Sequence, residues 1–322
     1  MKDDKGKGLI VAIAISIFLM GFVAGMFVMY FSSAKSSKNA SEDDTSTTIN
    51  IEGEEIKVYV PKREIRYGEI PVNSYDTEKF IIGDDGYMAY IDDNGNKLSH
   101  LGVDISYHQE SVDWNQLKES PCEFVMLRCG YRGYTEGGLL EDSKFREYAD
   151  AATLAGIPMG VYFFTQALTE EEAIEEADFA MSLIEDYSLS YPLAIDTEYV
   201  SDEDARTNKT ELSKEERTKC VVAFCERVKE FGYYPIVYAS ENWLRRSLDA
   251  EMLQEYEIWA PQYLDENDFM YDFTVWQYTD GGTIPGIDGV VDLNISMVDY
   301  ASFVPDLRKA YLTDGEIIEV EE

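Results

Sequence analysis

The chain has 322 residues, a formal net charge of −36 and 45% hydrophobic residues. This length suits one large domain with appendages or two modest domains, and the hydrophobic content excludes wholesale disorder. The negative charge argues against nucleic acid as a partner, because a phosphate backbone would be repelled.

Histidine and cysteine are scarce. The two histidines, His100 and His108, leave few candidates for a histidine-rich metal site or a Ser-His-Asp triad. The four cysteines form two sets, each within one predicted element and poorly placed for a bridge: Cys122 with Cys129, and Cys220 with Cys225. We expect buried free thiols, although cross-pairing between the two sets stays open.

The first predicted element is an uncharged apolar segment over residues 9–31, about 23 residues long, which is enough to span a bilayer. Lysines precede it, so the positive-inside rule favours a short cytoplasmic tail over residues 1–8. A cleaved signal peptide is the competing interpretation, with Ser32-Ser33-Ala34 as a tolerable cleavage site. We expect an uncleaved signal anchor that crosses the membrane once.

Two segments connect this anchor to the main domain. Residues 32–50 are rich in Ser, Thr, Lys and Asn and are predicted to be a flexible linker. Residues 51–99 are predicted to form a small β-rich spacer, with a strand at 56–60 and another at 87–91 that enters a hairpin turn. No chemistry is evident there, and its envelope partners, if any, are not identified.

From His100 onward, apolar strand-like runs recur at regular intervals. They lie at about 101–106, 123–129, 158–164, 192–198, 234–239, 257–263, 273–278 and 289–294. A helical segment follows each of the first five, whereas the last three leave no room for full helices. Alternating β and α elements indicate a parallel sheet, and eight strands suggest closure into a TIM-like α/β barrel. An open doubly wound sheet is the alternative.

The helix signals support this pattern. Thr169 with Glu172 and Ser213 with Glu216 both fit a capping box. The acidic run from Glu170 to Glu176 is interpreted as a solvated helix face.

Carboxylates recur at the ends of three predicted strands. Asp196 and Glu198 follow a buried apolar run and project to the same side, with Thr197 pointing the other way. Asp104 ends the first strand and Asp292 belongs to the eighth, which would be its neighbour in a closed barrel. We therefore expect four carboxylates to converge on one mouth of the barrel.

No histidine or cysteine accompanies these acids in metal-ligand spacing, which disfavours a transition metal. A hard-cation site of carboxylates stays possible. Acid pairs without a metal are typical of glycosidic bond cleavage, in which one carboxyl donates a proton and another stabilises developing charge. We expect no metal and no cofactor.

Aromatic and amide side chains cluster at the same strand ends, where sugar rings could stack and form hydrogen bonds. The candidates for substrate binding are Tyr162, Phe164, Tyr238, Trp259, Tyr263, Gln277 and Tyr278. Only one side of each strand can face the barrel interior, so core packing accounts for about half of the aromatics there.

Residues from about 101 to 296 resemble the glycoside hydrolase family 25 lysozymes, the cell-wall muramidases. The matching pieces are Gly102-Val103-Asp104-Ile105-Ser106, Val112-Asp113-Trp114, Ala155 to Phe164, Asp196-Thr197-Glu198, Trp276-Gln277-Tyr278 and Val291-Asp292-Leu293-Asn294. The resemblance implies an irregular barrel of five β/α units and three further strands, in a catalytic domain placed at residues 100–312 and followed by an acidic tail at 313–322.

The resemblance also implies hydrolysis of the β-1,4 bond between N-acetylmuramic acid and N-acetylglucosamine in peptidoglycan. Glu198 matches the family's general acid, and Asp196 matches the acid that assists the substrate's acetamido group or a water. Asp104 and Asp292 match the other two active-site carboxylates. The chain departs from the family at Glu110 and in the acidic loop 201–211.

Three functions remain open at this point. The first is a membrane-anchored muramidase whose catalytic domain lies outside the cell and faces the wall of a Gram-positive bacterium. The second is an inactive glycan-binding scaffold of an envelope machine. The third is a hydrolase of another N-acetylated glycan such as chitin.

Overall fold

The computed structural model describes residues 46–51, 54–59, 66–67, 70–264 and 267–305. The predicted tail 1–8, membrane segment 9–31 and acidic tail 313–322 lie outside the described residues. Among the residues described, no helix has both the length and the apolar character needed to cross a membrane. The chain divides into two compact units, one of Met1–Val60 with Lys309–Glu322 and one of Pro61–Arg308.

The described part of the first unit is an antiparallel pair, β1 (Ser46–Ile51) and β2 (Glu54–Tyr59). Strand β2 confirms the strand predicted at 56–60. The linker predicted over 32–50 is wrong for its last five residues, which belong to β1. Thr47, Thr48 and Ile49 are β-branched, a property that favours strands, and each is in register with a residue of β2.

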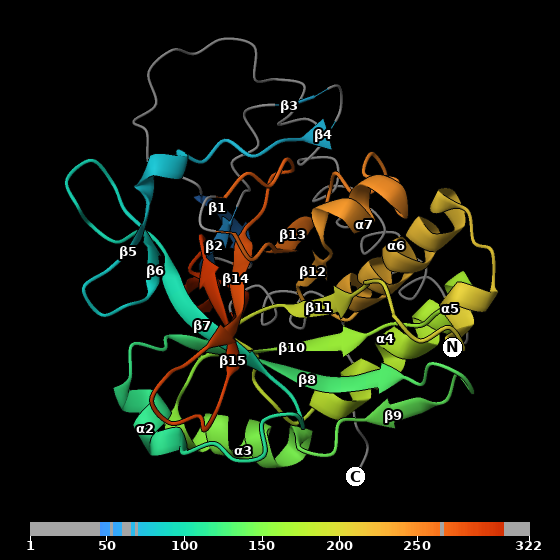
Figure 1. The fold of residues 1–322 in the computed structure, drawn as a ribbon, viewed down its shortest axis with the longest axis horizontal. Coiled ribbons are helices and arrows are strands. Elements are labelled where there is room, and N and C mark those ends of the chain that lie inside the picture. The colour runs from blue at the N-terminus through green and yellow to red at the C-terminus, as the bar shows by residue number, and fades with distance from the viewer. Residues whose placement is uncertain (1–45, 52–53, 60–65, 68–69, 265–266, 306–322) are drawn as a thin grey trace, which may run out of the picture. The chain divides into compact units, whose positions relative to one another are not determined.

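The second unit is built on a closed barrel, which excludes the open doubly wound sheet. Its strands are β7 (His100–Ile105), β8 (Phe124–Arg132), β10 (Met159–Phe164), β11 (Leu193–Asp196), β12 (Pro235–Tyr238), β13 (Glu257–Pro261), β14 (Val275–Gly282) and β15 (Val291–Ser296). Each strand pairs with the next one in this series. The last strand, β15, pairs with the first, β7, and this pairing closes the ring. All eight predicted strands are confirmed. Figure 1 shows β8, β10 and β11 running side by side in one direction.

An α-helix follows each of the first five barrel strands, as predicted. These helices are α2 (Trp114–Glu119), α3 (Phe145–Ala155), α4 (Glu170–Ile184), α6 (Lys214–Glu230) and α7 (Glu241–Arg246). Helices α3, α4 and α6 pack on the outer face of the barrel. Shorter elements are β9 (Leu139–Glu141), which pairs with β8, α5 (Arg206–Lys209), and the 3₁₀ turn η2 (Tyr300–Ser302). No α-helix lies between β13 and β15 in the residues described there.

The predicted helix starts are largely confirmed. Ser213 and Glu216 form a reciprocal capping box at α6. Thr169 caps α4, but the Glu172 carboxylate accepts from the Leu168 N–H (2.8 Å) instead of from the cap residue. The solvated face predicted for 170–176 is wrong at Glu176, which is fully buried because α4 turns this residue toward the end of β8, where Arg132 Nε donates to it (2.7 Å).

Strand β15 is antiparallel to both of its neighbours, which corrects the prediction of a wholly parallel sheet. Only eight residues separate β14 from β15. A parallel connection needs a crossover of about a dozen residues or more, so this short link can only form a hairpin. The N-terminal end of β15 therefore lies at the barrel end where the parallel strands finish.

At the end of the barrel where the parallel strands begin, packed side chains fill the interior. The rings of Phe124 and Tyr191 stack with centroids 4.2 Å apart and planes 9° apart. Gly102 is required beside them, because a Cβ at that position would lie 2.3 Å from the Phe124 ring. This packing closes one end of the barrel, so a cavity can open only at the other.

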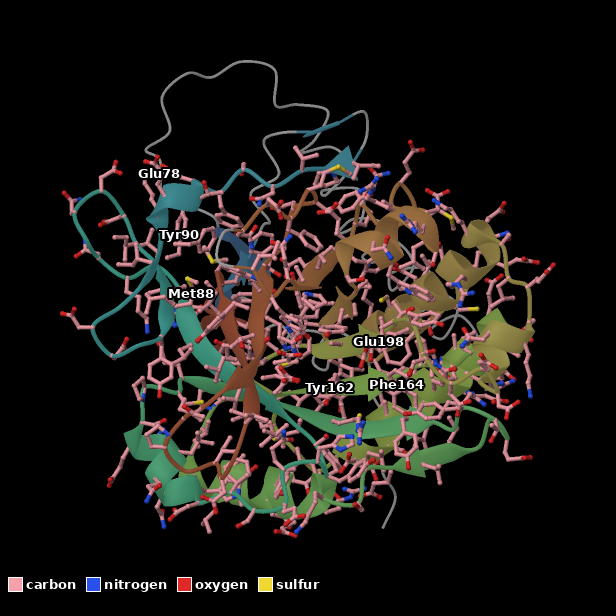
Figure 2. All side chains as sticks on the ribbon, viewed as in Figure 1. Glu78, Met88, Tyr90, Tyr162, Phe164 and Glu198 are labelled. Carbon is pink, nitrogen blue, oxygen red and sulfur yellow. The ribbon has the colours of Figure 1, made fainter. Side chains whose placement is uncertain are left out.

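Residues from Ile70 to Ser99 pack on the barrel and belong to the same compact unit, so the boundary predicted at residue 99 does not separate two units. Their elements are β4 (Ile70–Pro71), the 3₁₀ turn η1 (Thr77–Lys79), β5 (Phe80–Ile82) and β6 (Met88–Tyr90), preceded by β3 (Arg66–Tyr67). Strand β6, with Met88 and Tyr90 labelled in Figure 2, confirms the strand predicted at 87–91. The four cysteines are free and buried, as predicted.

Candidate active site

A cavity of about 490 Å³ opens at the barrel end where the parallel strands finish, and all four predicted carboxylates line it: Asp104, Asp196, Glu198 and Asp292. Asp104 is near the end of β7 and Asp196 ends β11, with Glu198 two residues further on. Asp292 is near the start of β15 and lies opposite Asp104 in the strand register. The predicted convergence is correct, but Asp292 arrives there because β15 is antiparallel.

The buried Asp104 and the half-buried Asp292 form a pair that titrates as a unit. Burial raises the pKa of Asp292 to about 8, with the Asp104 charge adding to the effect. Burial also raises the pKa of Asp104 to about 6, although hydrogen bonds from Asn294 and Gln277 oppose the rise. Near neutral pH the pair therefore holds one proton. The two amide donors on Asp104 Oδ2 favour its ionised form, which leaves the proton to Asp292.

A chain of hydrogen bonds fixes the charged Asp104. Gln277 Nε2 and Asn294 Nδ2 both donate to Asp104 Oδ2, at 2.7 and 2.8 Å. The Gln277 carbonyl in turn accepts from the hydroxyls of Tyr238 (2.9 Å) and Tyr263 (2.7 Å). On the other side, Trp259 Nε1 donates to Asn294 Oδ1 at 2.8 Å. Four predicted substrate-binding residues thus also orient one carboxylate.

Asp196 and Glu198 form the second pair. Asp196 is 7% exposed, and its Oδ1 has no hydrogen-bond donor among the described residues. Burial and the Glu198 charge raise the pKa of Asp196, whereas the charge of Arg128 opposes the rise. Glu198 stands at the mouth of the cavity, and desolvation there, together with the Asp104 charge, raises its pKa. Each carboxyl of the site therefore holds a proton more readily than an ordinary one.

The backbone between these two acids is tied to the outside of the barrel. Thr197 points away from the cavity, as predicted, and its Oγ1 accepts from Trp243 Nε1 of α7 at 3.0 Å. The Arg217 guanidinium lies 5.0 Å from the Trp243 ring. This contact fixes the strand end from which both Asp196 and Glu198 project.

The structure divides the predicted substrate-binding residues into three groups. Tyr162, Phe164, Tyr238, Trp259 and Gln277 line the cavity, and Figure 2 shows Tyr162 and Phe164 close to Glu198. Tyr263 is 47% exposed and is not part of the lining, although its hydroxyl donates to Gln277. Tyr278 does not reach the cavity. Gln277 faces inward, so the strand alternation turns Tyr278 outward, against Trp276 (ring centroids 6.0 Å apart).

Sequence reasoning missed several lining residues, of which Arg128 is the most informative. It lies on β8, two residues beyond the inward-facing Met126, so counting by two along the predicted strand could have found it. Its Nε donates to Asp142 (2.8 Å), and its guanidinium lies 4.9 and 5.3 Å from the ring centres of Tyr107 and Tyr131. The other missed residues are Ser106, His108, Gln109, Tyr134, Tyr199, Val200 and Ser201.

The chemistry of this arrangement is proton transfer in a polar cavity. Two pairs of acids with raised pKa values face a space large enough for a sugar unit, and carboxyl groups of this kind serve glycosidic bond cleavage. Among the described residues, no group of three or more His, Cys, Asp and Glu side chains is arranged to hold a metal ion.

Comparison with known proteins agrees with this fold. The family model "Glycosyl hydrolases family 25" matches residues 103–287, which include Asp104, Asp196 and Glu198. The autolytic lysozyme of Clostridium acetobutylicum is 27% identical over 194 residues, covering 60% of this chain and 54% of that protein. The uncharacterized protein YegX of Escherichia coli K12 is 27% identical over 216 residues, covering 65% of this chain and 74% of YegX. The chain thus spans about half the length of that lysozyme.

Two solved structures share the fold. The spore cortex lytic enzyme SleM of Clostridium perfringens has a TM-score of 0.55 and 22% identity, over 62% of this chain and 68% of SleM. The modular autolysin LytC of Streptococcus pneumoniae has a TM-score of 0.54 and 23% identity, over 80% of this chain and 58% of LytC. The family match covers more than half of the chain and includes three of the four converging acids. The chain belongs to glycosyl hydrolases family 25.

Proposed function

We propose that this chain is a peptidoglycan muramidase. It hydrolyses the β-1,4 bond between N-acetylmuramic acid and N-acetylglucosamine. The observation that carries the proposal is the convergence of Asp104, Asp196, Glu198 and Asp292 on one cavity, each with a raised pKa. Family membership and the similarity to an autolytic lysozyme support it.

Glu198 is the proton donor in this proposal. It stands at the cavity mouth, where a leaving glycosidic oxygen can reach it, and its raised pKa keeps a proton available. Burial and the Glu198 charge raise the pKa of Asp196, and the charge of Arg128 limits this rise. Asp196 then assists the substrate's 2-acetamido group or a water as the bond to the sugar carbon breaks. Water finally adds to that carbon, and its proton returns to the site.

The remaining two acids stabilise charge. The ionised Asp104, held by Gln277 and Asn294, sits where positive charge develops on the sugar ring. Asp292 shares a proton with it, so the pair adds one negative charge and not two. This arrangement limits the like-charge repulsion that four carboxylates in one cavity would otherwise create.

The test compares full-length wild type with Glu198→Gln on purified peptidoglycan, and measures soluble fragments released over time. We expect the variant to lose at least about 100-fold in rate, since a positioned general acid contributes that much. Glu119→Gln, on the exposed face of α2, is the matched control and should retain full activity. Tight binding of wild type without turnover would favour the inactive scaffold instead, and preferential cleavage of chitin oligomers would favour the third function.

We further propose that residues 9–31 anchor the enzyme in the cell membrane with the barrel facing the wall. The uncharged apolar length of this segment supports the proposal. Full-length protein should stay with the membrane pellet after an alkaline carbonate wash and should be digested by protease added to intact spheroplasts. Release into the wash, or protection of the barrel from the protease, would contradict the proposal.

A further inference from the structure

Beyond Glu198, the connection between β11 and α6 has no part in the proposed reaction, yet it forms one wall of the cavity. Its first residues, Tyr199, Val200 and Ser201, line the cavity directly after Glu198. The segment 201–211 is one of the two places where the sequence departs from the family pattern. We therefore asked what holds this loop in place and what it presents to the cavity.

The loop is tied to two other loops at the barrel mouth. The backbone N–H of Arg206 donates to the Tyr134 carbonyl at 2.7 Å, and its guanidinium donates to Glu172 of α4 at 2.6 Å. Thr207 Oγ1 donates to Gln166 Oε1, in the loop after β10, at 2.8 Å. The Arg206 side chain is only 16% exposed, so it is largely covered by these loops and holds them together.

The backbone at Gly137 leaves room for the Arg206 guanidinium. Gly137 has a φ of +70°, and a Cβ there would lie 2.3 Å from Arg206 Nη1. The Gly137 carbonyl accepts from Arg132 Nη1 at 2.8 Å, and Arg132 is itself paired with the buried Glu176. Within the loop, Asn208 Nδ2 donates to the carbonyls of Val200 (2.7 Å) and Asp202 (2.8 Å). Hydrogen bonds of Arg206 and Asn208 therefore hold this wall of the cavity in place.

Two exposed tyrosines lie on the surface that Arg206 holds in place. Tyr134 is 46% exposed and Tyr199 is 67% exposed, and both line the cavity. Tyr134 also packs edge-on against Phe164, with ring centroids 5.9 Å apart, which orients its ring. Figure 2 shows Phe164 and Glu198 at this side of the barrel. Exposed aromatic faces beside a polar cavity provide stacking surfaces for the apolar face of a sugar ring.

We propose that Tyr134 and Tyr199 form an accessory subsite for one uncharged N-acetylglucosamine ring of the glycan strand, beyond the two sugars that flank the cleaved bond, and that Arg206 is its positioning residue. The inference rests on the proposed function for the identity of the strand. The nearby exposed acids Asp202, Glu203 and Asp204 would repel a sugar that carries a carboxylate, which selects the neutral one. The enzyme then binds long strands more tightly than short ones.

The experiment measures affinity in the full-length Glu198→Gln protein, by calorimetry, for peptide-free peptidoglycan strands of two and eight sugars. The disaccharide is N-acetylmuramic acid linked to N-acetylglucosamine, which fills only the two positions that flank the cleaved bond, so we expect the octasaccharide to bind more tightly. Tyr134→Ala or Tyr199→Ala should weaken binding of the octasaccharide by about 3–10-fold, the size of one stacking contact, and should leave binding of the disaccharide unchanged. Phe231→Ala, which removes an equally exposed ring (46%) at the end of α6, is the matched control and should change neither affinity.

Arg206 is tested by the same comparison of affinities for the short and the long strand. Arg206→Gln should weaken binding of the octasaccharide as the tyrosine variants do, and Arg206→Lys should restore part of the lost affinity. A general loss of folding would instead weaken binding of both ligands together. Equal affinity for the two lengths, or tyrosine variants that bind the octasaccharide as the parent does, would overturn the subsite. Wild type that binds the octasaccharide more tightly but does not cut it would leave the subsite standing and refute the muramidase proposal.

Discussion

At the scale of single residues, the site concentrates negative charge that the fold must stabilise. Asp104 and Asp292 face each other across two strands, and one proton between them keeps the pair at a single charge near neutral pH. An unfolded carboxyl has a pKa of about 4, so this pair binds more protons in the folded protein than in the unfolded chain between that value and about 8. The contribution of the pair to folding stability therefore falls as pH rises through that window.

Replacing Asp292 by Asn should therefore stabilise the protein at pH 8 while lowering its activity. The amide resembles the protonated carboxyl and never ionises, so the variant should match wild type near pH 4 and exceed it increasingly above. We expect a gain on the order of 1 kcal/mol, or about 2–4 °C in the unfolding midpoint, since a partly exposed group gives less than its full shift. Thermal unfolding of both proteins from pH 4 to pH 8 measures it. A midpoint difference that does not depend on pH would contradict the assignment of the proton to Asp292.

The four acids could be predicted because each stands at an end of an apolar strand, which is visible along the chain. Tyr278 was placed wrongly because sequence alone does not fix which face of β14 is inward. The inward face follows from Gln277, whose partners Asp104, Tyr238 and Tyr263 come from distant parts of the chain. Tyr134 could not have been found, because its place in the cavity depends on Arg206, 72 residues further on.

At the scale of elements, the end of β11 is held from outside by α7. The hydrogen bond from Trp243 to Thr197 fixes the backbone between the two carboxyls that the proposal assigns to catalysis. A strand end left without this contact can rotate, and a small misplacement of catalytic groups costs rate. The catalytic geometry is therefore tied to the packing of a six-residue helix.

The variant Trp243→Phe tests this link. It keeps an aromatic ring against Arg217 but removes the N–H donor, at a stability cost of about 1 kcal/mol. We expect kcat on peptidoglycan to fall by about 3–10-fold with little change in KM, because the substrate contacts remain. Trp114→Phe, on α2, is the control and should retain its kcat. Unchanged kcat in Trp243→Phe would show that the hydrogen bond does not position the acids.

The direction of β15 shows what a strand pattern leaves open. The apolar run over 289–294 predicted the strand but not its orientation, which follows from the eight-residue link to β14. The link length was visible in the sequence, so the antiparallel pairing could have been predicted from the shortness of the connection. Its consequence is that Asp292 reaches the cavity from the start of its strand.

At the scale of the whole molecule, the barrel includes a segment that precedes its first strand. Phe80 packs edge-on against Trp276 (5.1 Å), and the Tyr75 hydroxyl donates to the Phe273 carbonyl (3.2 Å). Val72 forms a β-bridge with Tyr271. The sequence suggested a separate spacer because residues 51–99 lack the β/α rhythm. The contacts that join residues 72–80 to the barrel are made with residues distant in sequence and leave no local pattern.

We expect Phe80→Ala to destabilise the barrel itself. Phe80 is half-buried, so its removal should cost about 1–3 kcal/mol, less than for a fully buried ring. Chemical denaturation followed by tryptophan fluorescence should show one transition at a lower midpoint, since Trp276 reports on the same contact. Ile82→Ala, at a 58% exposed position on β5, is the control with little expected change. A midpoint equal to that of wild type would indicate that this segment folds separately from the barrel.

The most direct test of the central claim is the identity of the sugar at the new chain ends. Peptidoglycan digested by the full-length protein is reduced with borohydride and hydrolysed, and the sugar alcohols are identified. The account predicts muramic acid at the new reducing ends, with the yield falling at least about 100-fold in Glu198→Gln. New ends that carry glucosamine, or equal yields from Glu198→Gln and wild type, would contradict it.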